Sequence, residues 1–220
     1  MINESRQAFL RRGLAELPDL PELHQRGRNG EELATDEAAV WKRVLDYRLA
    51  VWLKHARILE THGGMGIGTA LYRHAAPQAS IVALTDYRQA VDLTGQFDLI
   101  DVDPFGLPYA VLAYALPLLA PDGVLLVSNG EALAVWRNLR RQQYAPTENF
   151  GRRLPRWVVA EYLPRLAALT HLPVRFFYAF PSNVRAVLCA HELPAHLWHG
   201  CQQWMWWLQR YANEAQFTLC

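Results

Sequence analysis

Short apolar runs alternate with amphipathic segments through the middle of the chain. The runs RILE (57–60), SIVALTD (80–86), FDLIDVD (97–103) and GVLLVSN (123–129) lack the polar–apolar alternation of half-exposed strands. Helical patterns lie in ALYRHA (70–75) and in residues 108–120. Strands covered on both faces and separated by helices predict an α/β fold with a mostly parallel sheet.

Further elements are predicted on both sides of these runs. A helix is expected over 36–55, because two adjacent apolar stripes give the wide face of a helix packed on a sheet. Residues 156–170 predict another helix, and 174–193 predict two strands joined by a tight turn, an antiparallel hairpin that closes the sheet. The stripes of the first helix are Val40, Val44, Tyr47 and Val51, and Trp41, Leu45, Leu49 and Trp52.

The pattern divides the chain into three parts. Residues 1–34 are polar and rich in proline and glycine, so we expect a short helix near 3–16 followed by an arm. Residues 35–195 hold the sheet, and 196–220, with four of the eight tryptophans, form a C-terminal helix packed on the domain or extending it. Only ten residues separate Asp86 from Phe97, so one βα unit of a complete doubly wound sheet is shortened.

Composition indicates where the protein works but not which reaction, if any, it catalyses. The 220 residues are 51% hydrophobic, which predicts a single hydrophobic core. The net charge is only +1, so the protein as a whole has no positive field that would attract a polyanion. Three scattered cysteines fit a reducing compartment, and no residues stand at metal-ligand spacing. The N-terminus lacks the apolar region of a secretory signal, and no window suggests a membrane span. We therefore expect a soluble, cytoplasmic protein.

The segment ILETHGGMGIGT (58–69) places a glycine loop between a strand and a helix. The nicotinamide fingerprint G-x-G-x-x-G fails, because Thr69 stands at its last position. The spacing G-x-G-x-G after Glu60 resembles the S-adenosylmethionine loop of class I methyltransferases, which implies their Rossmann-like sheet and their cofactor. A glycine-rich turn that binds nothing is the alternative. The candidate cofactor contacts are Glu60, His62, Gly63, Gly64, Gly66, Gly68, Asp86, Tyr87 and Asp101.

The run DVDPFG (101–106) follows the third apolar strand, where α/β sheets bind their ligands. Asp101 and Asp103 point to the same side of that strand, because strand side chains alternate. An exocyclic base amine is a poor nucleophile, and a carboxylate that accepts its N–H helps to direct its lone pair. Asp103, Pro104 and Phe105 would supply the acceptor, a rigid backbone and a stacking ring. A β-turn that only ends the strand is the alternative.

DVDPFG resembles motif IV of the tRNA guanine-26 N2-dimethyltransferase family and, more loosely, the motif (D/N/S)PP(Y/F/W) of DNA and RNA amino-methyltransferases. Pro108 also matches that tRNA family, whereas Leu107 replaces a small hydroxyl residue. The resemblance covers about residues 57–193 and implies an N-methyltransferase with Asp103 on the target amine. The glycine loop is richer than usual, and we expect a compact protein without the family's large C-terminal domain.

Residues 136–157 interleave arginines with four aromatic residues, a composition suited to phosphates and unstacked bases. A solvated helix–loop–helix anchored by its rings is equally compatible. The Trp-rich C-terminus fits core packing, a homodimer surface or base stacking. The candidate substrate contacts are Gly106, Arg137, Arg140, Arg141, Arg152, Arg153 and Arg156.

Together the motifs predict an S-adenosylmethionine-dependent N-methyltransferase acting on a nucleobase amine, with RNA favoured over DNA and guanine N2 in tRNA as the leading target. DNA amino-methylation and small-molecule or protein N-methylation stay open. So does a non-catalytic relative that binds nucleic acid or a partner.

Overall fold

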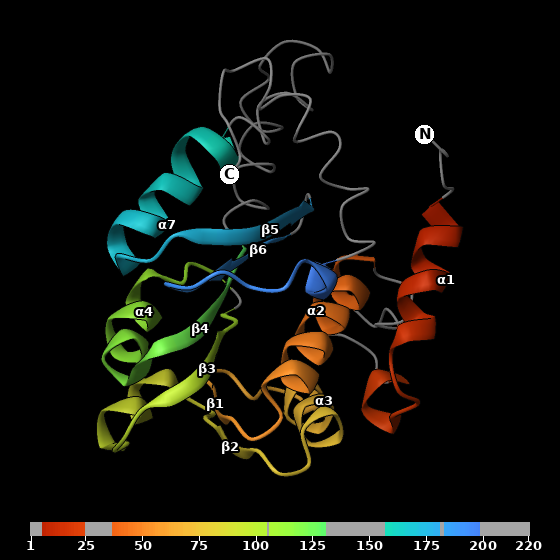
Figure 1. Ribbon diagram of the computed structural model, residues 1–220, viewed down its shortest axis with the longest axis horizontal. Helices are drawn as coiled ribbons and strands as arrows, with labels where there is room; N and C mark the ends of the chain where they lie inside the picture. The colour runs from red at the N-terminus through yellow and green to blue at the C-terminus, as the bar shows by residue number, and fades with distance from the viewer. Residues whose placement is uncertain (1–5, 25–36, 105, 131–156, 181–182, 199–220) are drawn as a thin grey trace.

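The computed structural model describes residues 6–24, 37–104, 106–130, 157–180 and 183–198. Within them the chain builds one six-stranded sheet in the order β2-β1-β3-β4-β6-β5 (Figure 1). The strands are β1 (Arg57–Glu60), β2 (Ser80–Ala83), β3 (Phe97–Val102), β4 (Leu119–Asn129), β5 (Val174–Phe180) and β6 (Asn183–Leu188).

Four of the six strands pair in parallel, and the pairing is antiparallel toward the β5 edge. The strands β1 to β4 pair in parallel, whereas β6 runs antiparallel to both β4 and β5. This confirms the predicted α/β sheet with its C-terminal hairpin. In register, Glu60 of β1 lies beside Asp101 of β3, so two acids meet at the carboxyl ends of central strands.

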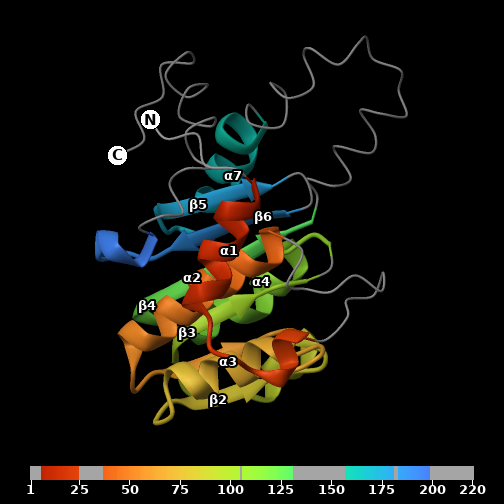
Figure 2. The same cartoon turned by 90° about the vertical axis from the view of Figure 1, so that its right-hand side faces the viewer.

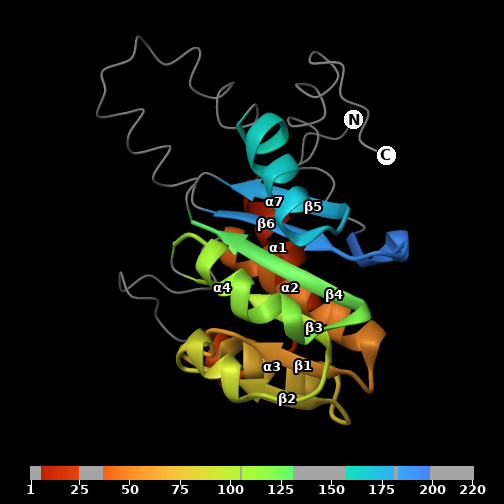
Figure 3. The ribbon, with the colours of Figure 1, turned by 90° about the vertical axis from the view of Figure 1, so that its left-hand side faces the viewer.

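Helices cover both faces of the sheet. Figure 2 shows the layer of α1 (Arg6–Glu16), α2 (Glu37–Leu53) and α3 (Ile67–Ala75), and Figure 3 shows α4 (Tyr109–Ala115) and α7 (Leu163–Thr170) on the opposite face. A π-helical turn, Val158–Tyr162, leads into α7, and a 3₁₀ turn, Pro21–His24, follows α1.

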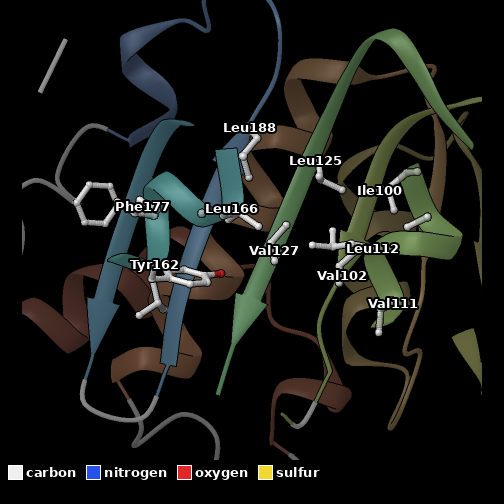
Figure 4. Close-up of a cluster of buried hydrophobic side chains, with 14 of the residues drawn as sticks. Ile100, Val102, Val111, Leu112, Leu125, Val127, Tyr162, Leu166, Phe177 and Leu188 are labelled. Atoms are coloured by element: carbon white, nitrogen blue, oxygen red, sulfur yellow. The ribbon is translucent and has the colours of Figure 1, made fainter. Parts of the chain in front are cut away.

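Neighbouring residues of each strand enter different cores, because their side chains alternate between the faces. Ile100 and Val102 of β3 pack with Leu112 of α4 and Leu166 of α7 (Figure 4). Leu99, the residue before Ile100, belongs to the other core. That core also contains the following residues of α2: Trp41, Val44, Leu45, Leu49 and Ala50.

The wide apolar face predicted for residues 36–55 therefore packs on the sheet on one side and on α1 on the other. The rings of Phe9 and Trp41 stack with centroids 4.4 Å apart. At Gly13 a side chain has no room, because a Cβ atom would lie 2.8 Å from Cγ1 of Val40. The N-terminal helix is thus part of the domain core.

The shortened βα unit is confirmed. Between β2 and β3 the chain forms only a 3₁₀ turn, Tyr87–Asp92 (η3). The predicted helix over 108–120 is too long, because α4 ends at Ala115 and a 3₁₀ turn containing Pro117 follows. Proline cannot donate the next helical hydrogen bond, so the chain turns early into β4.

Two further observations concern the described part of the chain alone. None of its helices is long and apolar enough to cross a lipid bilayer. None of its His, Cys, Asp and Glu side chains form a group of three or more that could hold a metal ion. The predicted Trp-rich helix lies mostly outside it, since the structure is described only to the 3₁₀ turn Ala195–Trp198.

Candidate functional site

The glycine loop is tied to the ends of three neighbouring strands. Thr61 donates its amide to the carbonyl of Asp101 at 3.0 Å, and Gly63 donates to the carbonyl of Leu84 at 2.8 Å. Gly64 and Gly66 have φ values of 46° and 78°, the left-handed region that glycine enters without strain. These contacts place the loop above the carboxyl ends of β1, β2 and β3.

The helix that follows the loop begins without a side-chain cap. Gly66 is the N-cap of α3, so no side chain accepts from the first-turn amides there. Gly68, in the first turn of α3, packs directly on Glu60, since a Cβ atom would lie 2.2 Å from Oε1 of Glu60. The loop can therefore bring backbone amides to an acidic ligand group.

Glu60 lies beneath this loop. Its side chain is buried and accepts a hydrogen bond from Oγ1 of Thr69 at 2.5 Å. Burial, followed by repulsion from Asp101, raises the pKa of Glu60 to about 7. The structure thus shows Glu60 supporting α3, and its predicted contact with a cofactor stays a prediction.

Asp86, one of the predicted cofactor contacts, stands just past the end of β2. It caps η3 in a capping box with Gln89, and Arg88 pairs with both carboxylate oxygens. The hydrogen bonds from Arg88 lower the pKa of Asp86 to about 2. Because both partners are partly or largely exposed, this ion pair is weak and can open for a competing donor.

Aromatic rings gather beside Asp86. Tyr87 lies 5.8 Å from the His62 ring and 5.4 Å, edge to face, from the ring of Tyr114 on α4. His62 also shares a 2.9 Å hydrogen bond with Oγ1 of Thr61. This group provides an apolar surface next to the acid, which suits a flat heterocycle.

The second motif begins where β3 ends. Asp103 is partly exposed and binds Nζ of Lys42, which reaches across from α2. The carbonyl of Gly106 accepts from the amide of Gly130 at 3.1 Å, which ties the motif to the end of β4. Pro104 is half-buried, and Phe105 lies outside the described residues.

Three cations determine the charge state of Asp103. Burial alone would raise its pKa, but the Lys42 ammonium, then the guanidinium groups of Arg185 and Arg43, lower it below the ordinary range. Burial lowers the pKa of Lys42, while attraction to Asp103 opposes that change. At neutral pH Asp103 is therefore ionised, so it can accept hydrogen bonds but does not readily take up a proton.

Asp101 has a different role from Asp103. It is fully buried, and Nη1 of Arg185 and the hydroxyl of Tyr72 donate to its two oxygens at 2.9 and 2.6 Å. Arg185 also donates to Oγ of Ser128 at 2.8 Å and to Asp46 of α2. Protein donors thus occupy both carboxylate oxygens of Asp101, and its predicted contact with a cofactor stays a prediction.

Sequence reasoning missed Lys42, Arg43, Asp46 and Arg185. A signal was present, because these charges interrupt the apolar stripes of α2 and the apolar strand NVRAVL. Buried charges need partners, and those of Arg185 are distant in the chain. Asp101 lies 84 residues and Asp46 lies 139 residues before Arg185.

The glycine loop, Asp86 and Asp103 follow the carboxyl ends of β1, β2 and β3, which run parallel to one another. Burial lowers the pKa of His62 in the glycine loop, and the negative charges of Asp103, Asp101 and Asp86 oppose that change. The glycine loop, Asp86 and Asp103 thus occupy the edge of the sheet that is formed by the carboxyl ends of its parallel strands. The predicted arginine contacts at 137, 140, 141, 152, 153 and 156 lie outside the described residues.

Comparison with known proteins identifies the fold. No family model and no curated protein matches the chain. The O-methyltransferase TomG from Streptomyces achromogenes, solved with S-adenosylmethionine, matches with a TM-score of 0.51 at 16% identity, over 87% of this chain and 100% of that one. The chain has the fold of an S-adenosylmethionine-dependent methyltransferase.

Other solved structures are similar at lower scores. Trm1 from Pyrococcus horikoshii, in complex with S-adenosylmethionine, matches over 68% of this chain with a TM-score of 0.45 and 17% identity. The match covers 54% of that protein, so the chain spans about half its length. The N-methyltransferase NodS from Bradyrhizobium japonicum matches with a TM-score of 0.42 and 15% identity, over 68% of this chain and 94% of that one.

Proposed function

We propose that this protein is an S-adenosylmethionine-dependent N-methyltransferase that acts on an exocyclic nucleobase amine, with guanine N2 in tRNA or another RNA as the target. The observation that carries the proposal is the position of Asp103. It follows β3 in the motif DPFG, and the glycine loop and Asp86 follow the carboxyl ends of the parallel neighbours β1 and β2.

The residues at this edge fit the cofactor. The uncapped first turn of α3 offers amides for the carboxylate of its amino-acid part, and left-handed Gly64 and Gly66 allow close backbone approach. Asp86 is ionised and partly exposed, as an acceptor for two ribose hydroxyls must be. Tyr87 offers a ring beside it for the adenine. When bound, the cofactor supplies an electrophilic methyl group.

Asp103 would hold the amine for attack. One oxygen, Oδ2, binds Lys42, while Oδ1 makes no hydrogen bond within the described part of the chain. The free oxygen can accept an N–H of a neutral amine and turn the nitrogen lone pair toward the methyl group. Because the pKa of Asp103 is low, the proton released after transfer passes on to solvent rather than resting on the carboxylate.

The other residues of the motif would position the base. Pro104 restricts the backbone after Asp103, Phe105 would stack on the base, and Gly106 leaves open space, since a Cβ atom there would meet nothing within 4 Å. The six arginines between 137 and 156 would contact RNA phosphates.

A methyl-transfer assay with matched variants tests this proposal. Radiolabelled S-adenosylmethionine is incubated with the protein and unmodified tRNA transcripts, DNA or protein extract, and each fraction is counted. We expect label in RNA, at the guanine N2 position after nuclease digestion. Label only in DNA, protein or small molecules would contradict the assigned substrate.

The role of Asp103 is tested in the same assay. Asp103→Ala should abolish transfer and spare cofactor binding. Asp98→Asn is the control, because Asp98 lies at the opposite end of β3, where it accepts the amide of Arg57 at 2.7 Å. Retained transfer by Asp103→Ala would refute the role.

A further inference from the structure

A lysine stands against the proposed amine acceptor. Lys42 lies within α2 among residues of the apolar core, and its side chain is only 10% exposed. Removing an ammonium from water is unfavourable by several kcal/mol unless a charged partner is close. Its Nζ binds Oδ2 of Asp103, so the partner is the residue on which the proposed chemistry depends.

Lys42 also balances the charge of the whole cluster. Three cations, Lys42, Arg43 and Arg185, face three carboxylates, Asp46, Asp101 and Asp103, and every member of the set is bonded to another. The carboxylate of Asp103 therefore offers a strong hydrogen-bond acceptor inside a set in which basic and acidic side chains are equal in number.

We propose that Lys42 makes the site selective for neutral, conjugated amines over cationic alkylamines. This inference rests on the proposed function and deepens it. A conjugated amine such as an aniline or a base amine is uncharged at neutral pH and needs only an acceptor for its N–H. An alkylammonium would bring a fourth cation beside Lys42 and has no lone pair with which to attack.

The same electrostatics predict what loss of Lys42 does. Without the ammonium, the cluster carries one uncompensated negative charge at Asp103, which is 22% exposed and open to an incoming cation. A unit charge at contact distance changes the affinity for a cation by about tenfold or more, even when solvent screens the pair. The preference for neutral amines should fall accordingly.

Aniline and benzylamine form a matched probe pair for this test. They differ by one methylene group, but only benzylamine is a cation at neutral pH. Each is titrated calorimetrically into the full chain with and without saturating S-adenosylhomocysteine, whose sulfur is neutral. We expect the wild-type protein to prefer aniline.

Three variants separate charge from packing. Lys42→Gln keeps an N–H donor for Asp103 but removes the charge, and it should shift the ratio of affinities toward benzylamine by about tenfold or more. Lys42→Arg keeps the charge and should keep the wild-type ratio. Asp103→Asn leaves Lys42 uncompensated and should move the ratio in the opposite direction, further toward aniline.

The outcomes distinguish this inference from the proposed function. Three results would each overturn the inference. The first is an equal ratio of aniline to benzylamine affinity in wild type and Lys42→Gln, and the second is a preference of wild type for benzylamine. The third is the absence of benzylamine binding to folded Lys42→Gln. If Lys42→Gln does not fold, the test rests on Asp103→Asn, whose affinity ratio should shift toward aniline. An unchanged ratio in Asp103→Asn refutes the role proposed for Lys42. Absence of S-adenosylhomocysteine binding would instead count against the proposed function.

Discussion

Replacing Arg185 by methionine should be among the most destabilising single changes in the described part of the chain. Arg185 lies in β6 with no exposed surface and joins β3, β4 and α2 through Asp101, Ser128 and Asp46. Methionine fills a similar volume but carries no charge. The two carboxylates would then remain buried without their shared cation.

The structure sets the expected size of this effect. Removing one partner of a buried ion pair lowers the free energy of unfolding by about 3–5 kcal/mol. Tyr72 still donates to Asp101 and Arg43 still pairs with Asp46, so the lower part of that range is expected. For a domain of this size such a loss lowers the melting temperature by about 10 °C.

Thermal and urea unfolding, followed by circular dichroism at pH 7, measure this loss. Arg88→Met is the matched control, because Arg88 also pairs with an aspartate but at the surface, and it should leave the midpoint unchanged. Asp101→Asn added to Arg185→Met should recover part of the loss. Equal midpoints for Arg185→Met and wild type would refute the claim that this cluster stabilises the site.

Three further predictions concern the glycine loop and the acids beside it. Gly68→Ala should lower stability by about 1–3 kcal/mol in urea unfolding, since its Cβ would meet Glu60, whereas Gly106→Ala, in open space, should change it little. Because the pKa of Glu60 is raised to about 7, the contribution of protonated Glu60 to the free energy of unfolding is fully present below pH 4.5 and is lost as the pH rises through 7. Glutamine cannot ionise, so the free energy of unfolding of Glu60→Gln should rise by about 3 kcal/mol relative to that of wild type between pH 4.5 and pH 7. Parallel pH–stability curves of the two proteins would contradict this. Asp86→Asn should weaken cofactor binding about tenfold in calorimetry, and Arg88→Ala should not weaken it, because that change frees the carboxylate.

Local patterns predicted most of the fold. The uninterrupted apolar runs gave the parallel strands, and the two stripes over 36–55 gave the wide face of α2, because burial on one or both faces leaves a direct record in the sequence. The short interval between Asp86 and Phe97 gave the shortened βα unit by length alone. The early end of α4 was missed, although Pro117 was a visible reason for it.

The charged cluster behind the candidate site could not be derived in the same way. Lys42 and Arg185 were visible as charges in apolar segments, but their partners come from strands and helices far away in the chain. A single sequence shows that a buried charge needs a partner and does not say which one. Asp103 was therefore identified by its motif, whereas its ion pair required the folded chain.

The central claim is that this edge of the sheet binds S-adenosylmethionine next to an amine acceptor. Calorimetric titration of the folded chain with S-adenosylmethionine tests it most directly, with Asp103→Asn and Asp86→Asn measured in parallel. We predict one saturable site in wild type, retained in Asp103→Asn and weakened in Asp86→Asn. No binding to the folded wild-type chain would contradict the account and favour a non-catalytic relative of the methyltransferases.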